Sequence, residues 1–208
     1  MAEELVFYTN PMSRGRIVRW MLEETGCAYR TEILGFGKEM KSPGYLAVNP
    51  MGKVPAILHR GTVVTEGAAI CAYLADAFPE AGLAPAPGDA RRGPYYRWMF
   101  FAAGPVEAAL SNKAFGFEVP TDKQRAVGYG SVEDVMNALE YAVSQSEYIA
   151  GDRFTAADVY VGSQIGWGMM FGTLEKRPAY EAYWQRIGNR PAAIRAREID
   201  DALVPPKA

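Results

Sequence analysis

The chain has 208 residues, of which 49% are apolar and 22% charged, and 22 Lys and Arg against 24 Asp and Glu leave a formal net charge of −2. This apolar fraction is enough to bury a core, and the low net charge excludes an intrinsically disordered chain. The near-neutral charge supplies no broad basic field for nucleic acid. No stretch approaches the roughly 18 consecutive apolar residues of a membrane helix. The length suits one large domain or two small ones.

Cysteine use and the first residues of the chain indicate a reducing compartment. Cys27 and Cys71 are too few for a disulfide framework, and no C-x-x-C motif is present. The opening Met-Ala-Glu-Glu-Leu is acidic where a secretory signal is basic. One His and two separated Cys offer no metal-ligand set. We therefore expect a cytoplasmic protein without a bound metal, a membrane segment or a nucleic-acid partner.

The first part of the chain predicts a small α/β layer. Short apolar runs between turn residues predict strands, and apolar residues recurring every three to four positions predict helices. In chain order we expect a strand at 5–8, a helix at 13–24 closed by Gly26, and a strand at 29–34. Two further strands, 54–58 and 62–65, flank a turn of His59, Arg60 and Gly61. A helix at 66–78 follows. On the first of these helices, Arg16 and Arg19 fall on the polar face.

The second part of the chain predicts an all-α domain. Residues 79–89 contain three prolines and two glycines and are the best linker candidate. Helical patterns follow at 91–114, 121–146, 155–170 and 179–198, with interruptions at Gly104-Pro105, Gly128, Gly130 and Pro191 that predict bends or breaks. The expected organisation is an α/β domain at 1–79, a linker at 80–89 and a helical domain at 90–208.

Four local motifs stand in order along this plan. They are Phe-Tyr-Thr-Asn-Pro-Met-Ser-Arg at 7–14, Asn-Pro-Met-Gly-Lys-Val-Pro-Ala-Ile-Leu at 49–58, Thr-Glu-Gly-Ala-Ala-Ile-Cys-Ala-Tyr-Leu at 65–74 and Phe-Thr-Ala-Ala-Asp at 154–158. With a thioredoxin-like layer before a helical domain, the chain resembles the cytosolic glutathione transferase family, and in particular bacterial members of theta-like or beta-like type with serine at the first helix. The resemblance covers nearly the whole chain. It implies the glutathione transferase fold and glutathione as a co-substrate, without a further cofactor.

Ser13 is the candidate catalytic residue, because the resemblance puts the family's catalytic hydroxyl or thiol at this turn. A helix N-terminus offers unpaired N–H groups and a positive dipole end, which together with a donating hydroxyl favour a thiolate. The alternative role for Ser13 is an N-cap, although Arg16 stands where a capping box has Glu or Gln. Tyr8 lies on the strand itself and is expected to be packed rather than directed at a thiol, and Thr9 remains an alternative donor.

The resemblance also implies a glutathione site around four residues. Pro55 would follow a cis peptide bond and turn the Val54 backbone outward, so that glutathione adds as an extra strand. Glu66 and Gly67 open a helix, which suits the γ-glutamyl carboxylate, and Glu66 would meet the ammonium group. The family usually has Ser at the Gly67 position. The missing hydroxyl therefore predicts weaker glutathione binding.

Lysines and apolar residues complete the expected site. Lys53 matches the family's position for the glycyl carboxylate, with Lys38 and Lys41 as further candidates. Thr155 and Asp158 fit a T-x-x-D capping box with a structural role. The candidates for an apolar electrophile pocket are Met12, Phe36, Phe101, Phe115, Trp167 and Phe171.

The main functional hypothesis is an enzyme that stabilises the glutathione thiolate for attack on an apolar electrophile. Peroxide reduction or isomerisation could use the same thiolate. A thiol-transferase role is disfavoured, because those relatives have Cys where Ser13 stands. The alternative from another class is a non-catalytic regulator or binding protein of the same fold, which Gly67 favours. The resemblance further implies a homodimer, with Met51 on a loop that contacts the partner.

Overall fold

The computed structural model describes residues 4–204 of the chain. Its contacts divide the chain into two compact units, of which the first runs to Leu83 and resumes at Arg190, and the second spans residues 84–189. The first unit contains β1 (Leu5–Thr9), α1 (Gly15–Thr25), β2 (Arg30–Ile33), α2 (Pro43–Leu46), β3 (Ala56–His59), β4 (Thr62–Thr65), α3 (Gly67–Ala77) and α9 (Pro191–Ala202). The second contains α4 (Arg92–Phe101), α5 (Glu107–Ala114), α6 (Val132–Ser144), α7 (Ala156–Phe171) and α8 (Pro178–Gly188).

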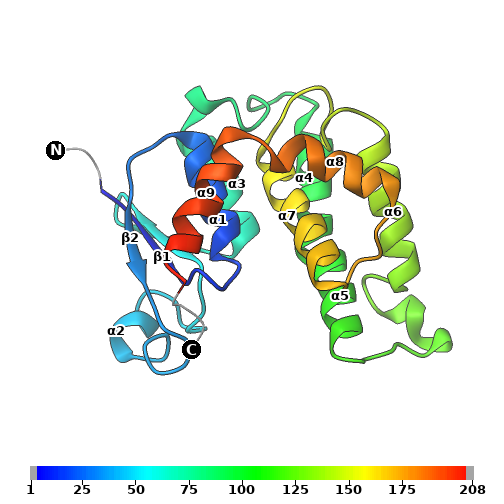
Figure 1. The fold of residues 1–208 in the computed structure, drawn as a ribbon, viewed down its shortest axis with the longest axis horizontal. Helices are drawn as coiled ribbons and strands as arrows, with labels where there is room; N and C mark the ends of the chain where they lie inside the picture. The colour runs from blue at the N-terminus through cyan, green and yellow to red at the C-terminus, as the bar shows by residue number, and fades with distance from the viewer. Residues whose placement is uncertain (1–3, 205–208) are drawn as a thin grey trace. The chain divides into compact units, whose positions relative to one another are not determined.

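A four-stranded mixed sheet forms the centre of the first unit, with strand order β2-β1-β3-β4. β1 and β2 are parallel and joined through α1, whereas β3 pairs antiparallel with both β1 and β4. The helices α1 and α3 pack on each other and against the sheet (Figure 1). Phe7, Ile57 and Leu74 are fully buried between these layers. The thioredoxin-like α/β layer predicted from the sequence is confirmed.

The hairpin between β3 and β4 is tighter than the sequence analysis expected. His59 is the last residue of β3 rather than part of the turn, and it is buried against Phe78 with its Nδ1 3.0 Å from the Tyr73 hydroxyl. The turn consists of Arg60 and Gly61, both at positive φ, which is the geometry of a two-residue hairpin loop. Contacts with Tyr73 of α3 and with Phe78 directly after it account for the burial of an imidazole that sequence reasoning put in a loop.

The C-terminal helix α9 belongs to the α/β unit, whereas the sequence plan counted residues 190–208 with the helical domain. Figure 1 shows α9, in red, lying along α1, in blue. Arg19 therefore does not lie on an open polar face: its guanidinium is buried and pairs with Asp200 of α9 at 3.2 Å. A charge on the outer face of α1 is buried because a distant segment covers that face.

The second unit is entirely helical apart from an isolated bridge between Tyr148 and Gly151. α7 is buried along most of its length and packs against α4 and α8. Its first turn has the predicted capping box, in which Asp158 accepts from the Thr155 N–H at 2.9 Å. Between α4 and α5 the chain passes through a π-helical segment, Ala102–Val106, because Pro105 cannot donate a helical hydrogen bond. Across residues 4–204, no helix is long and apolar enough to cross a membrane.

Candidate functional site

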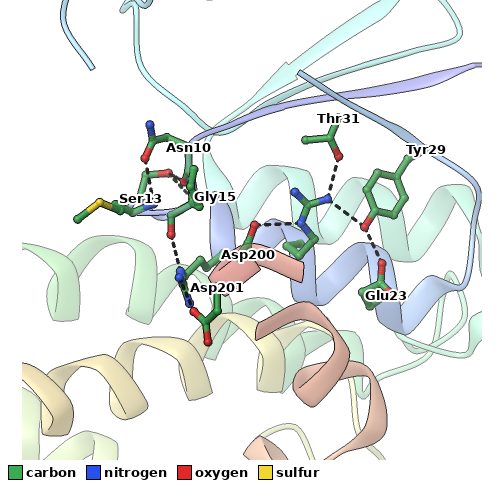
Figure 2. A network of polar contacts seen from close by, with 12 residues as sticks. Asn10, Ser13, Gly15, Glu23, Tyr29, Thr31, Asp200 and Asp201 are labelled. Carbon is green, nitrogen blue, oxygen red and sulfur yellow. Dashed lines mark hydrogen bonds and ion pairs between the residues drawn. The ribbon is translucent and has the colours of Figure 1, made fainter. Parts of the chain in front are cut away.

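The turn between β1 and α1 holds Ser13 in a fixed orientation. The Ser13 hydroxyl donates to the Asn10 carbonyl at 2.7 Å and accepts from the Gly15 N–H at 2.9 Å (Figure 2). Asn10 fixes the turn from inside, because its Oδ1 accepts from the Met12 N–H at 2.9 Å and its Nδ2 donates to the Leu34 carbonyl at 2.8 Å. Ser13 is partly exposed. Its hydroxyl caps an orphan N–H at the start of α1.

The neighbouring hydroxyls are less available than that of Ser13. Thr9 is completely buried, and its Oγ1 has no hydrogen-bond partner among the described residues. A Cβ at Gly15 would lie 1.9 Å from this oxygen, so only glycine allows α1 to begin this close to β1. Tyr8 is half-buried and packs against Tyr45, with 5.7 Å between the two ring centroids. Both observations favour Ser13 as the donor to a sulfur atom.

The segment before β3 has a free backbone edge. The Val54–Pro55 peptide bond is cis, as the resemblance implied. Within residues 4–204, no hydrogen bond engages the N–H or the C=O of Val54. The preceding carbonyl, that of Lys53, accepts from the Tyr45 hydroxyl at 2.6 Å and from Asn49 Nδ2 at 2.7 Å. The backbone next to Val54 is thus anchored while Val54 itself can pair with an extended peptide.

Lys41 and Lys53 lie close to the same loop. The Lys41 ammonium donates to the Met51 carbonyl at 2.7 Å, and the side chains of Lys41, Lys53 and Lys38 are exposed. Burial of Tyr45 raises the pKa of its hydroxyl to about 12, so this group remains a hydrogen-bond donor at neutral pH. The loop therefore carries the exposed Lys53 side chain and holds the Lys41 ammonium at Met51, and hydrogen bonds from Tyr45 and Asn49 fix its backbone at Lys53.

The start of α3 combines a helix N-terminus with a strained residue. Glu66 is the N-cap at φ 65° and ψ 117°, and its exposed carboxylate makes no capping hydrogen bond. Such a conformation costs a non-glycine residue about 1–3 kcal/mol and is concentrated at ligand sites. Gly67 begins the helix. The free N–H groups there can bind a carboxylate, and Glu66 can bind a cation.

The sheet register brings these segments to one edge. Tyr8 near the end of β1 pairs with Ala56 at the start of β3, and Ala56 pairs with Thr65 at the end of β4. Ser13, Val54 and Glu66 each lie a few residues beyond one of these paired positions. The same edge receives the end of β2, since Thr9 pairs with Ile33. This edge therefore presents the Ser13 hydroxyl, the free backbone of Val54 and the N-terminus of α3 side by side.

The apolar candidates lie partly in each unit. Met12 and Phe36 are exposed residues of the first unit, at 68% and 63%. In the second unit, Phe115 follows α5 and is 74% exposed, with its ring centroid 6.3 Å from that of Phe117. Trp167 is half-buried on α7. Among the described residues, no group of three His, Cys, Asp or Glu side chains could hold a metal ion.

Sequence reasoning missed the ionic contacts between α1 and α9, which Figure 2 shows for Asp200 and Asp201. Arg19 also donates to Tyr29 at 3.1 Å and Thr31 at 2.8 Å. The guanidinium of Arg16 bonds to the Pro11 carbonyl through Nε and pairs with Asp201 at 2.7 Å. Burial raises the pKa of Asp200 above its usual range despite the nearby Arg19. No local pattern could reveal partners that are more than 180 residues away in the sequence.

The chain is similar to known proteins in both sequence and structure. Residues 12–77 match the family described as "Glutathione S-transferase, N-terminal domain", and residues 108–191 match "Glutathione S-transferase, C-terminal domain". The curated sequence of glutathione S-transferase GstA from Escherichia coli O157:H7 is 32% identical over 161 residues, covering 76% of each chain. The crystal structure of a Methylococcus capsulatus glutathione transferase is similar, with a TM-score of 0.79, 28% identity and coverage of 96% of this chain and 100% of that one. The Phanerochaete chrysosporium glutathione transferase URE2P6, solved with oxidized glutathione, has a TM-score of 0.82 and 26% identity over 98% of this chain and 99% of that one.

Proposed function

The chain belongs to the glutathione S-transferase family, and we propose that it binds reduced glutathione along the edge of its sheet and activates the thiol with Ser13. The observation that carries this proposal is the bonding of the Ser13 hydroxyl, which accepts from the Gly15 N–H at the start of α1. That bond polarises the hydroxyl. Its proton is correspondingly a better donor to a sulfur anion.

Thiolate formation requires one exchange of hydrogen bonds. The Ser13 proton leaves the Asn10 carbonyl and turns to the sulfur, while the bond from Gly15 stays in place. The Asn10 carbonyl retains the Ser13 N–H, at 3.1 Å, and is not left unpaired. A neutral bond is thus replaced by a charge-assisted one, which is about twice as strong. Lowering a thiol pKa by about two units requires about 2.7 kcal/mol, which one or two such bonds supply.

The rest of glutathione is bound by the groups around Ser13. The Val54 N–H and C=O pair with the cysteinyl unit as an added strand beside Pro55. The N–H groups opening α3 at Gly67 bind the γ-glutamyl carboxylate, and Glu66 binds the ammonium group. Lys53 and Lys41 bind the glycyl carboxylate.

The reaction is a nucleophilic transfer to an apolar electrophile. The thiol proton passes to water, and the thiolate sulfur uses a lone pair to form a bond to an electrophilic carbon. A leaving group then departs with its bonding electrons, or, at an activated double bond, the neighbouring carbon takes up a proton. Met12 and Phe36, which are 68% and 63% exposed in the first unit, are the residues proposed to receive the apolar part of this substrate.

Glutathione binding and turnover test this function together. Calorimetric titration with reduced glutathione should be saturable, and a panel containing an aryl halide, an enone and a hydroperoxide should yield product with at least one compound. Saturable binding without turnover on any of them would favour the non-catalytic regulator. Formation of oxidised glutathione in the presence of the hydroperoxide, with no product from the aryl halide or the enone, would favour the peroxidase.

Two wider features of the function follow from the same proposal. The enzyme works in the cytoplasm, where glutathione is kept reduced. It acts as a homodimer, with Met51 at the contact, because this side chain is 62% exposed on a loop fixed by Asn49 and Lys41.

A further inference from the structure

We propose that Arg16 is a positioning residue for Ser13, and that the C-terminal helix α9 acts on the reactive turn through it. The inference rests on the proposed function of Ser13. It adds a residue that does not touch glutathione, and a segment from the other end of the chain, to the machinery that holds the thiolate.

The geometry of Arg16 joins three parts of the first unit. From the first turn of α1, its Nε donates back to the carbonyl of Pro11, which lies two residues before Ser13. Its Nη2 pairs with the Asp201 carboxylate of α9 at 2.7 Å. The side chain of Arg16 is 25% exposed and that of Asp201 is 65% exposed. One guanidinium therefore spans the reactive turn and α9.

The location of Arg16 is unfavourable for α1 itself. A cation near a helix N-terminus opposes the helix dipole, and the first turn of α1 contains no acidic residue. The Asp201 carboxylate offsets this charge from outside the helix. Arg16 thus contributes little to α1 as a helix former, while its hydrogen bond fixes the peptide plane between Pro11 and Met12.

Orientation of this plane affects Ser13 directly. Met12 donates its N–H to Asn10 Oδ1, and Ser13 donates both N–H and hydroxyl to the Asn10 carbonyl. Rotation of the peptide after Pro11 moves the Met12 N–H and hence the whole set of bonds. A misplacement of this kind weakens a charge-assisted hydrogen bond, whose strength depends on alignment.

The experiment measures the apparent pKa of glutathione bound to the full chain, from thiolate ultraviolet absorbance against pH, together with thermal stability. The variants are Arg16→Met and Asp201→Asn. The matched control is Arg195→Met, which removes another partly exposed ion pair between α9 and α1, that of Arg195 with Glu23 at 2.8 Å. This pair lies near the end of α1, away from the turn.

We expect Arg16→Met to raise the pKa of the bound thiol by roughly 0.5–1 unit, which is about three- to tenfold less thiolate below the pKa. Asp201→Asn should raise it by less, and Arg195→Met should leave it unchanged.

A fall of this pKa in Asp201→Asn would overturn positioning in favour of a direct effect of the Arg16 charge. Unchanged values in both variants would overturn the proposal by reducing Arg16 to a structural contact. Should Arg16→Met not fold, the exposed Asp201→Asn substitution decides alone. Absence of thiolate in the unmodified chain would instead refute the proposed function and this inference with it.

Discussion

At the scale of single residues, the hydroxyl of Ser13 and the missing hydroxyl at Gly67 have opposite consequences for glutathione. The Ser13 hydroxyl accepts from the Gly15 N–H, and in the proposed mechanism it keeps this bond when its proton turns to sulfur. Gly67 offers a backbone N–H at the start of α3 and no side chain. In the proposed site, Ser13 supplies a hydroxyl to the thiol, whereas the γ-glutamyl carboxylate meets only backbone N–H groups at Gly67.

Replacing Gly67 with Ser should tighten glutathione binding. A hydrogen bond to a charged group contributes about 1.5–3 kcal/mol, so the dissociation constant should fall by roughly tenfold or more. The backbone tolerates the change, because Gly67 is not one of the glycines at positive φ. Calorimetry with reduced glutathione measures the difference.

Gly67→Ala is the control for the backbone effect of that substitution. Alanine stabilises a helix relative to glycine by about 1 kcal/mol but offers no hydroxyl. Equal affinities of the Ser and Ala variants would show that the hydroxyl does not contact glutathione.

At the scale of elements, the contact between α1 and α9 depends on a buried ion pair. Arg19 and Asp200 are 2% and 1% exposed, and within residues 4–204 Arg19 Nη2 and Asp200 Oδ2 have no hydrogen-bond partner. The pair is therefore incompletely satisfied. Burying two charges in this way is costly unless both remain paired.

Removing one partner should destabilise the fold more than removing both. Arg19→Met or Asp200→Leu alone should lower the free energy of unfolding by about 3–5 kcal/mol, because an uncompensated charge remains buried. The double variant should be more stable than either single one. Urea denaturation measures all three, and a double variant that shows the sum of the single losses would contradict this account.

Elements and motifs of both units were predictable where their signals are local. The strand at β1, the helix break at Pro191 and the capping box at Thr155 each depend on residues within a few positions. The burial of Arg19 and His59 was not predictable. Each depends on a segment that only the tertiary fold brings into contact.

The candidate site was predictable to a similar extent. Ser13, Val54 and Glu66 came from motifs, and the register of β1, β3 and β4 explains why they share an edge. The bond from Arg16 to Pro11 and its pairing with Asp201 had no sequence signal, because arginine in a first helical turn is ordinarily a solvated residue.

At the scale of the whole molecule, buried and half-buried tyrosines make the free energy of unfolding sensitive to alkaline pH. Burial raises the pKa of Tyr29, Tyr45 and Tyr180 from 10.0 to about 12. Between these values the folded protein keeps protons that the unfolded chain loses. The free energy of unfolding should therefore fall as pH rises from about 10 to about 12.

Urea denaturation at several alkaline pH values measures this loss, and phenolate absorbance measures the titration itself. Tyr180→Phe removes one of the three groups and should reduce the slope. A single titration of all tyrosines near pH 10, without loss of stability beyond it, would refute the assignment.

Association of two chains is the other property of the whole molecule that can be tested. Met51→Asp places a charge at the proposed contact, where it would be desolvated, and should shift the dimer toward the monomer. Light scattering measures the mass, with Met170→Asp as a matched control at an exposed methionine of the second unit. An unchanged mass of the Met51 variant would exclude this loop from the contact.

The most direct test of the central claim is a titration with reduced glutathione at about pH 6.5, two units below the usual thiol pKa. Thiolate ultraviolet absorbance is followed for the unmodified chain and for Ser13→Ala. We predict saturable thiolate formation that disappears in the variant while glutathione still binds by calorimetry. Thiolate that persists undiminished in Ser13→Ala would contradict the assignment of Ser13 as the donor.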